Sequence, residues 1–405
     1  MSDRVFLDKK YVWLWGMQSL LLIILLPCLE YPDASAHFPK VYANNNSAYY
    51  FNLLSQITDF LNHYVLVDNQ RFSFDFDSFQ SKTSYFDKMY TNRWDHERWI
   101  YGLVVSLQLV NVIVCMISIF VFNKLIMSNN KLTLDEKNLF IKVNMIYYFM
   151  PSVSFLMLGI TPDFVIYICQ PFIVYFLYQK KYVLALFLSL FLLHEDRSAV
   201  IDILFCIVCM CYSIMQNAKI KVSYNILIVL TISFVFSWFV RNAYFNYLFA
   251  NIGIGTVDMS DLMVRLQENE QSMFLPTKIL NVFLTSLGLW GTTYWVFPVF
   301  YLFWGYFLMK ILIRWIKSKK RNAHFDILFI SSIIVVFCLV IVMPPYSHIR
   351  YFLFSIYMII WGGFIYVFND SYMLNNRRFR LFVKIIFVHN VSMGVLIFFI
   401  NNLFV

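Results

Sequence analysis

The chain has 405 residues, of which 60% are hydrophobic and 14% charged, and its formal net charge is +9. A water-soluble fold could not bury so much apolar surface, since even a domain of about 300 residues covers only about three quarters of its unfolded surface. The apolar runs are continuous, which excludes a transmembrane β-barrel with alternating strands of about ten residues. The composition predicts an all-α polytopic membrane protein.

The apolar segments predict about eleven transmembrane helices, which together form one membrane domain over residues 1–405. In chain order they cover residues 11–28, 100–122, 143–160, 164–178, 182–193, 199–215, 224–240, 294–313, 327–343, 351–368 and 385–403. The helices between residues 160 and 215 are short, and the two at 182–193 and 199–215 have fewer apolar residues than the roughly 20 that a span of the hydrocarbon core requires.

The distribution of charge supports this set of helices. If the N-terminus is cytoplasmic, the segments on that side carry 21 of the 32 Lys and Arg residues, and the opposite side carries 16 of the 23 Asp and Glu residues. Cytoplasmic segments of membrane proteins carry such an excess of Lys and Arg. We therefore expect a cytoplasmic N-terminus and a C-terminus on the outer side, which in a bacterial inner membrane is the periplasm. The positive charge follows from this orientation, so a nucleic-acid partner is unnecessary.

Two periplasmic segments are much longer than a connection needs, at residues 29–99 and 241–291. Long ordered loops are usually binding surfaces or lids, so we expect the chemistry on this side. Within the second loop, residues 277–291 are apolar enough for a re-entrant or interfacial helix. A cleaved signal peptide is the alternative for the first 36 residues, although their apolar run is longer than a usual signal-peptide core.

The first candidate site is the short turn "HEDRSA" between the predicted helices 182–193 and 199–215. It places His194, Glu195, Asp196 and Arg197 between two apolar runs. A charged group at membrane depth is costly unless it faces protein or a water-filled cavity, so we expect the turn to line a cavity. Asp202 extends its polar face into the next helix. The alternative is a solvated turn in which Asp196 and Arg197 pair locally.

The second candidate site is "YPDASAHF", directly after the first predicted helix. Asp33 and His37 are four residues apart and would share one face of a helix. An acid and an imidazole in this arrangement could bind a metal or act as a general base and the group that orients it. An interfacial turn capped by Asp33 is the equal alternative.

The third candidate site is "MPPYSHIRYF", where two prolines end one predicted helix and place His348 and Arg350 at the outer end of the next. The fork of an arginine side chain suits a phosphate or pyrophosphate group. The alternative is an arginine that extends its charged end to the membrane surface. Arg241 and Arg265, the arginines of the second long loop, could also bind an anion or could lie in solvent.

Cofactor and metal signatures are absent from the sequence. The seven cysteines all lie in apolar runs and are interpreted as small hydrophobic residues, including the Cys206-x-x-Cys209 pair. Dinucleotide-binding, Walker, zinc-protease and serine-hydrolase motifs are also missing. We therefore expect no cofactor and no resident metal. The missing Walker motif also counts against ATP-driven transport.

The pattern of the whole chain, rich in Phe and Tyr with about eleven spans and large periplasmic loops, resembles that of polytopic O-antigen and capsular polysaccharide polymerases. The resemblance covers architecture and rests on no diagnostic motif. It implies a glycosyltransferase of lipopolysaccharide biosynthesis that joins polyprenyl-diphosphate-linked repeat units at the periplasmic face of the bacterial inner membrane. The expected partners are these lipid-linked oligosaccharides and membrane lipids, with a chain-length regulator and a flippase as further candidates.

In a polymerase, a carboxylate or histidine takes the proton of the acceptor hydroxyl, and arginines stabilise the departing diphosphate. The expected catalytic residues are Asp33, His37, Glu195, Asp196 and His348. The expected pyrophosphate-binding residues are Arg197, Arg350, Arg241 and Arg265.

Two alternative functions stay open. "YPDASAHF" and the short helices in the middle of the chain also resemble membrane glycosyltransferases of the GT-C fold, which implies a single-sugar transferase. The second acid that this family places close to the first is missing here, because the next acidic residue after Asp33 is Asp59. The other alternative is a flippase for lipid-linked oligosaccharides, which would need more charges inside the membrane than Asp202.

Overall fold

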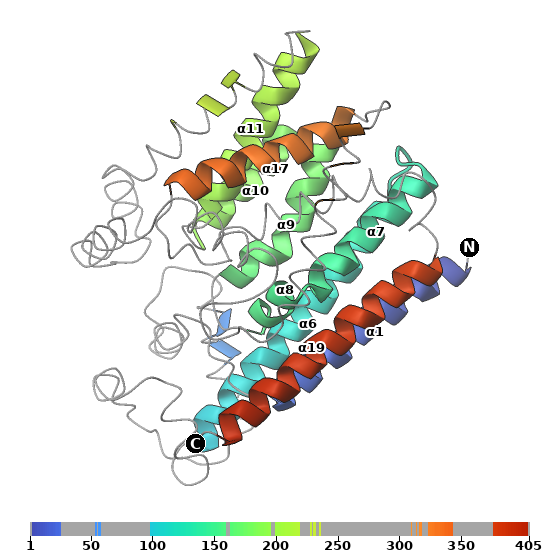
Figure 1. Cartoon of the computed structure of the whole chain (residues 1–405), viewed down its shortest axis with the longest axis vertical. Helices are drawn as coiled ribbons and strands as arrows, with labels where there is room; N and C mark the ends of the chain where they lie inside the picture. The colour runs from blue at the N-terminus through green and yellow to red at the C-terminus, as the bar shows by residue number, and fades with distance from the viewer. Residues whose placement is uncertain are drawn as a thin grey trace, which may run out of the picture. The chain divides into compact units, whose positions relative to one another are not determined.

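The computed structural model describes nine helices and a few isolated residues of the chain (Figure 1). The described residues are 2–25, 53–54, 56–57, 98–158, 163–195, 199–218, 227–228, 230–231, 235, 309, 313, 316–317, 323–342 and 376–403. Their elements are α1 (Ser2–Leu25), α6 (Arg98–Ser128), α7 (Leu134–Phe149), α8 (Pro151–Leu156), α9 (Asp163–Tyr178), α10 (Tyr182–Leu193), α11 (Val200–Asn217), α17 (Ala323–Val342) and α19 (Asn376–Leu403).

These elements are all α-helices, so the predicted all-α class is confirmed for the described part of the chain. The predicted spans at 224–240, 294–313 and 351–368 and the two long loops lie wholly or largely outside the described residues.

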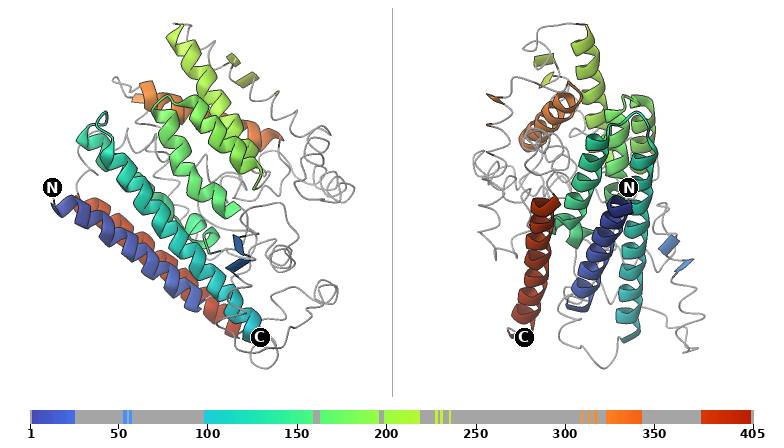
Figure 2. Two further views of the ribbon diagram at one scale, coloured as in Figure 1. Left: turned by 180° about the vertical axis from the view of Figure 1, so that it is seen from behind. Right: turned by 90° about the vertical axis from the view of Figure 1, so that its right-hand side faces the viewer.

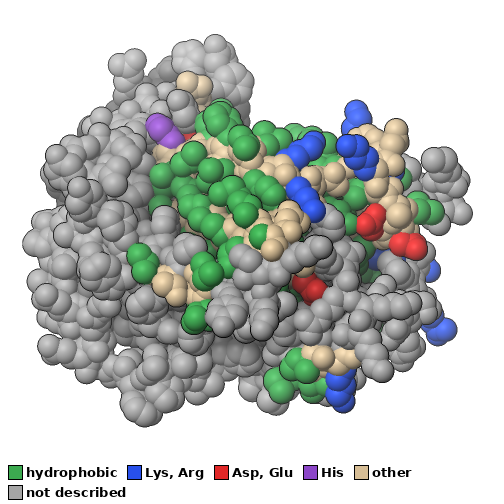
Figure 3. Space-filling view, turned by 90° about the horizontal axis from the view of Figure 1, so that it is seen from above, with side chains coloured by type: hydrophobic (Ala, Val, Ile, Leu, Met, Phe, Trp, Pro, Cys, Tyr) green, Lys and Arg blue, Asp and Glu red, His purple; other side chains and the backbone are tan. Residues whose placement is uncertain are grey.

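Three of the helices are long and apolar enough to cross a membrane: Val105–Ser128, Val200–Asn217 and Phe379–Leu396. Shorter apolar helices lie at Phe164–Tyr178, Tyr182–Leu193 and Asp326–Val335. Figure 3 shows hydrophobic side chains gathered in a broad area over the described surface on one face. Large apolar surfaces of this kind are unusual on soluble monomers and mark contact with lipid or protein. The prediction of membrane helices is confirmed in this coarse form.

The bounds of α9 and α10 agree with the sequence prediction to within one residue. Both segments are predominantly apolar, and ionisable or polar residues delimit them on either side. α10 is apolar on its outer face as well, since Val183 is 83% and Phe187 67% exposed. A helix that is hydrophobic all round belongs in a membrane or in the core of a large protein.

The turn between α9 and α10 ends the first helix with a Schellman motif. The Lys181 N–H donates to the Phe176 carbonyl over 2.8 Å, and the Lys180 N–H donates to the Leu177 carbonyl over 3.0 Å. Lys180 has a φ of 58°, a left-handed conformation that such motifs usually give to glycine. The motif satisfies carbonyls that the end of α9 would otherwise leave without a partner.

Several of the described helices extend further than the sequence prediction, which left residues 123–142 as a loop. α6 continues to Ser128, and α7 already begins at Leu134. The start of α7 is fixed by a capping box: the Thr133 N–H donates to Glu136 Oε2 over 2.8 Å, and the Glu136 N–H donates to Thr133 Oγ1 over 3.3 Å. The "TLDE" pattern was a signal for this start. α19 likewise begins at Asn376, before the predicted residue 385.

The predicted single helix at 143–160 is wrong, because the chain breaks between α7 and α8. α7 ends at Phe149 and α8 begins at Pro151. Proline has no backbone N–H to donate and its ring clashes with the preceding turn, so a helix cannot continue through it undisturbed. The break leaves carbonyl groups at the end of α7 without partners from their own helix.

Side chains from other helices bind the exposed carbonyls at this break. The Tyr148 carbonyl accepts hydrogen bonds from Trp15 Nε1 at 2.8 Å and from Ser154 Oγ at 2.6 Å. The Phe149 carbonyl accepts a hydrogen bond from Asn390 Nδ2 at 2.8 Å. Backbone groups in an apolar interior must find such partners, because water is excluded there. The break thus ties α1 and α19 to the last two residues of α7, Tyr148 and Phe149.

The chain divides into two compact units. Unit 1 consists of Met1–Lys131, Tyr148–Ile168 and Leu381–Val405. In this unit α1 packs against α6, and α19 lies beside α1 (Figures 1 and 2). Gly394 of α19 and Gly16 of α1 permit close packing: a Cβ at Gly394 would lie 2.8 Å from Leu22 Cδ2, and one at Gly16 would lie 2.9 Å from Met116 Sδ.

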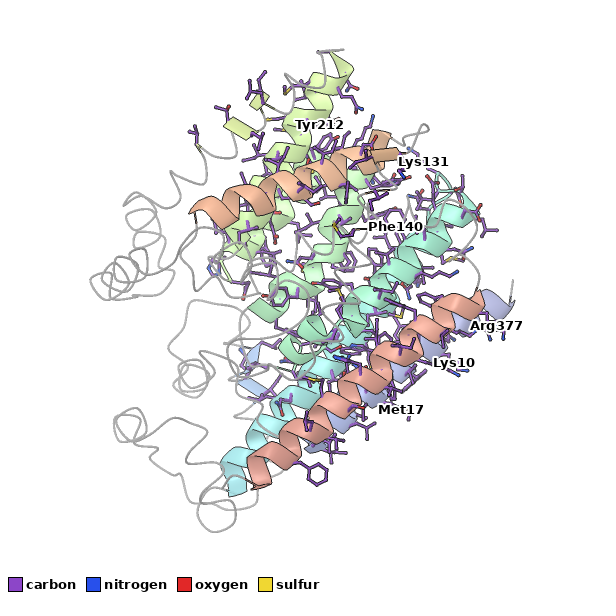
Figure 4. All side chains as sticks on the ribbon, in the orientation of Figure 1. Lys10, Met17, Lys131, Phe140, Tyr212 and Arg377 are labelled. Atoms are coloured by element: carbon purple, nitrogen blue, oxygen red, sulfur yellow. The ribbon has the colours of Figure 1, made fainter. Side chains whose placement is uncertain are left out.

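Unit 2 consists of Leu132–Tyr147 and Cys169–Arg380. In this unit α11 packs against both α10 and α17. Phe140 of α7, labelled in Figure 4, makes edge-to-face contacts with Tyr175 and Tyr178 of α9 at centroid distances of 5.7 and 5.0 Å. The Tyr178 hydroxyl donates to Glu136, and the Tyr147 hydroxyl donates to Gln170 Oε1 at 2.6 Å. These contacts fix the described part of α7 against α9.

Candidate functional site

One of the predicted site residues, Glu195, belongs to the described part of the chain. The other predicted site residues lie outside it: Asp33, His37, Asp196, Arg197, Arg241, Arg265, His348 and Arg350. The sequence-predicted site can therefore be built from the end of α10 and the start of α11.

The chain leaves α10 through a tight turn that begins at His194. The His194 N–H donates to the Phe191 carbonyl over 3.1 Å, and the Glu195 N–H donates to the Leu192 carbonyl over 2.9 Å. Bonds of this three-residue type tighten the last turn of a helix and satisfy carbonyls at its end. Glu195 is only 4% exposed, so its side chain is buried.

Asp202 lies in the first turn of α11 and is the more deeply buried of the two acids. It is 1% exposed, and among the described residues its Oδ2 atom has no hydrogen-bond partner. The positive end of the helix dipole lowers the cost of an acid at this position, typically by less than about 1 kcal/mol. A buried polar group without a hydrogen bond costs about 2–7 kcal/mol, so the dipole does not offset the burial of Asp202.

A third helix contributes to the same place. The thiol of Cys169 in α9 lies within electrostatic range of the carboxyl groups of both Asp202 and Glu195. Cys206, one turn after Asp202 on α11, lies within range of Asp202 and places its Sγ 3.5 Å from Ser189 Oγ of α10. Cys169, Glu195, Asp202 and Cys206 are named the Asp202 cluster below.

The Asp202 cluster is rich in hydrogen-bond acceptors and is surrounded by apolar helices. In a medium of low dielectric constant a hydrogen bond to a carboxyl group is stronger than in water, and an unmade one costs more. Among the described residues no group of three or more His, Cys, Asp or Glu side chains could hold a metal ion. The arrangement is chemically suited to bind a group that donates hydrogen bonds, such as a hydroxyl.

Sequence reasoning identified Glu195 as a site residue and noted Asp202, but it assigned Cys169 no place near them. The one sequence signal for Asp202 was an acid inside an apolar run, which is rare in helices of this kind. Cys169 gave no signal, because a cysteine in an apolar helix is ordinarily a small hydrophobic residue. Its position depends on how α9 packs within unit 2.

Comparison of the chain with protein-family models, with curated proteins and with solved structures finds no match in any of the three. A functional assignment for this protein therefore rests on its own residues and on the architecture of its helices.

Proposed function

We propose that the protein is a surface-polysaccharide polymerase that joins polyprenyl-diphosphate-linked repeat units at the periplasmic face of the bacterial inner membrane. The observation that supports it best is the burial of Glu195 and Asp202 at the adjoining ends of α10 and α11, in a chain with helices able to cross a membrane. Acids that are kept in such surroundings mark substrate or ion sites.

The reaction needs few groups. The oxygen of the acceptor hydroxyl attacks the anomeric carbon of the donor glycan, the bond from that carbon to the diphosphate oxygen breaks, and polyprenyl diphosphate leaves. A carboxylate takes the hydroxyl proton, for which Glu195 is the described candidate. Arginine side chains stabilise the charge on the departing diphosphate. Arg197, two residues after Glu195, is the nearest candidate in the sequence for this second role.

The number of membrane spans and their orientation belong to the same proposal. If the chain has about eleven spans and a cytoplasmic N-terminus, the end of α10 and the start of α11 lie on the periplasmic side. The reactive groups of lipid-linked donors are delivered to that side after the lipid has been flipped. The proposal therefore requires Glu195 and Arg197 to be reachable from the periplasm.

Deletion of the gene tests the function. The expected result is lipopolysaccharide that carries a single repeat unit, with long chains restored when the gene is supplied on a plasmid. An unchanged ladder of chain lengths would refute the proposal. Complete loss of O-antigen with shortened lipid-linked intermediates would favour the GT-C transferase. Accumulation of complete repeat units on the cytoplasmic side would favour the flippase.

Substitutions test the assignment of the site. Arg197→Ala and Arg350→Ala are each expected to abolish long chains while the amount of protein in the membrane stays normal. The matched control is Arg377→Ala, since Arg377 is an exposed arginine of α19 in the segment predicted to be cytoplasmic. Normal chain lengths in both Arg197→Ala and Arg350→Ala cells would contradict the assignment.

A further inference from the structure

We propose that Asp202 is a substrate-binding residue whose carboxyl group accepts a hydrogen bond from a sugar hydroxyl of the lipid-linked glycan. The inference rests on the proposed polymerase function, and it assigns a role to Asp202, which the sequence placed on the polar face of the first candidate site without a role. It is carried by the burial of Asp202, by the groups that surround it, and by its place in the first turn of α11.

Burial without a partner is the first observation. Asp202 is 1% exposed, and its Oδ2 atom has no hydrogen-bond partner among the described residues. The neighbouring positions of α11 are apolar and buried, including Ile201, Ile203 and Leu204. An aliphatic side chain would satisfy the packing of this helix without leaving an acceptor unused. The acid is therefore a cost to the fold that a ligand would offset.

The chemistry of the neighbours is the second observation. Cys169 comes from α9, Glu195 from the turn after α10 and Cys206 from α11 itself, and each has an electrostatic interaction with another member of the cluster. Thiols are weak donors, and the carboxyl groups are acceptors when ionised. In the described part of the chain no Lys, Arg or His side chain forms an ion pair with Asp202. Among the described residues, Asp202 Oδ2 therefore lacks a strong hydrogen-bond donor.

The position of the cluster indicates which donor fits. The described residues form no metal-binding group of three ligands. Asp202 lies at the end of α11 that adjoins Glu195, and it is therefore close to the turn where the proposed transfer takes place. A glycan brings several hydroxyl groups to that turn, and each hydroxyl can donate one hydrogen bond. A sugar hydroxyl held by Asp202 would also orient the glycan for attack.

The decisive variant is Asp202→Leu. Leucine has as many side-chain heavy atoms as aspartate, and it removes a buried carboxyl group whose unpaired burial costs stability. The purified variant should therefore melt at the same temperature as the parent protein or above it. In membranes supplied with lipid-linked repeat units, its rate of chain extension at limiting substrate should fall by about tenfold or more.

A purely structural residue would lower the melting temperature together with the rate, and that outcome would overturn the inference. Normal extension in a folded variant would overturn it as well.

Asp326→Asn is the matched control, because Asp326 is also a buried acid, at 6% exposure, in the first turn of a unit 2 helix, α17. It is expected to leave chain extension unchanged.

A second measurement uses the unmodified protein. A hydrophobic carbodiimide, which reacts with carboxyl groups in apolar surroundings, should label Asp202, and the purified lipid-linked repeat unit should reduce that labelling. Equal labelling with and without the repeat unit would overturn the inference.

The two proposals can fail separately. If cells without the gene still extend chains, the polymerase function fails, whatever Asp202 does. If those cells lose long chains and the Asp202→Leu gene restores them, the function stands and the role of Asp202 fails.

Discussion

Asn390 provides a sharp test of how the helix break between α7 and α8 is stabilised. Its Nδ2 atom donates to the Phe149 carbonyl over 2.8 Å, and the Asn390 side chain is fully buried. The substitution Asn390→Leu keeps a side chain of similar size but removes the donor. The Phe149 carbonyl would then lose a hydrogen bond in an interior from which water is excluded.

The expected loss of stability follows from the cost of an unsatisfied carbonyl. A buried acceptor that loses its partner costs about 1–3 kcal/mol, whereas measured hydrogen bonds between membrane helices average about 0.6 kcal/mol and reach about 1.7. The Phe149 carbonyl lies at a broken helix end, where its own helix provides no replacement. We therefore expect about 1–2 kcal/mol, which corresponds to a melting temperature lowered by about 2–4 °C.

Thermal unfolding in detergent, followed with a thiol-reactive dye, measures this change. Cys115, Cys206 and Cys209 are free and buried, so they react with the dye when the helices separate. Ser392→Ala is the control, because Ser392 lies on the exposed side of α19 and should melt like the parent protein. A melting temperature for Asn390→Leu equal to that of the control would refute the reasoning about the break.

Three further predictions use the same unfolding assay. Gly394→Ala should destabilise unit 1 by about 1–3 kcal/mol, because its new Cβ would meet the buried Leu22 side chain at 2.8 Å; an unchanged melting temperature would contradict the close packing of α19 on α1. Gly16→Ala should cost less, since Met116, at 2.9 Å, has a flexible side chain that can move away; a larger loss than that of Gly394→Ala would reverse this argument. Lys180→Gly should raise stability by about 1 kcal/mol, because φ is 58° there, and a fall would show that the lysine side chain matters more than its backbone conformation.

Part of the fold could be predicted from the sequence to within a residue, and α9 and α10 show why. Both segments are predominantly apolar and end at polar or ionisable residues, so composition along the chain marks both ends. The prediction missed the extra turns of α6 and α7 because it was based on hydropathy, which detects the apolar part of a helix. A helix that continues into polar sequence gives no hydropathy signal there. The capping box at Thr133 was a local signal that could have corrected the start of α7.

The helix break shows where local reasoning stops. Pro151 predicts that the helix is disturbed, but it does not predict which groups donate hydrogen bonds to the carbonyls that the break leaves without partners. Trp15 and Asn390 do so from positions 133 and 241 residues away from their partners in the chain. No periodic pattern in the sequence connects such distant residues.

The sequence by itself determined the helical class, the apolar character of the helices and the charged turn after α10. These properties depend on the residues of one segment and on their preference for lipid or water. Tertiary packing decided that Glu195 and Asp202 are buried and that Cys169 of α9 joins them. Burial depends on which faces of separate helices meet. The sequence could therefore name candidate acids, and only the packing of α9, α10 and α11 could gather them into one cluster.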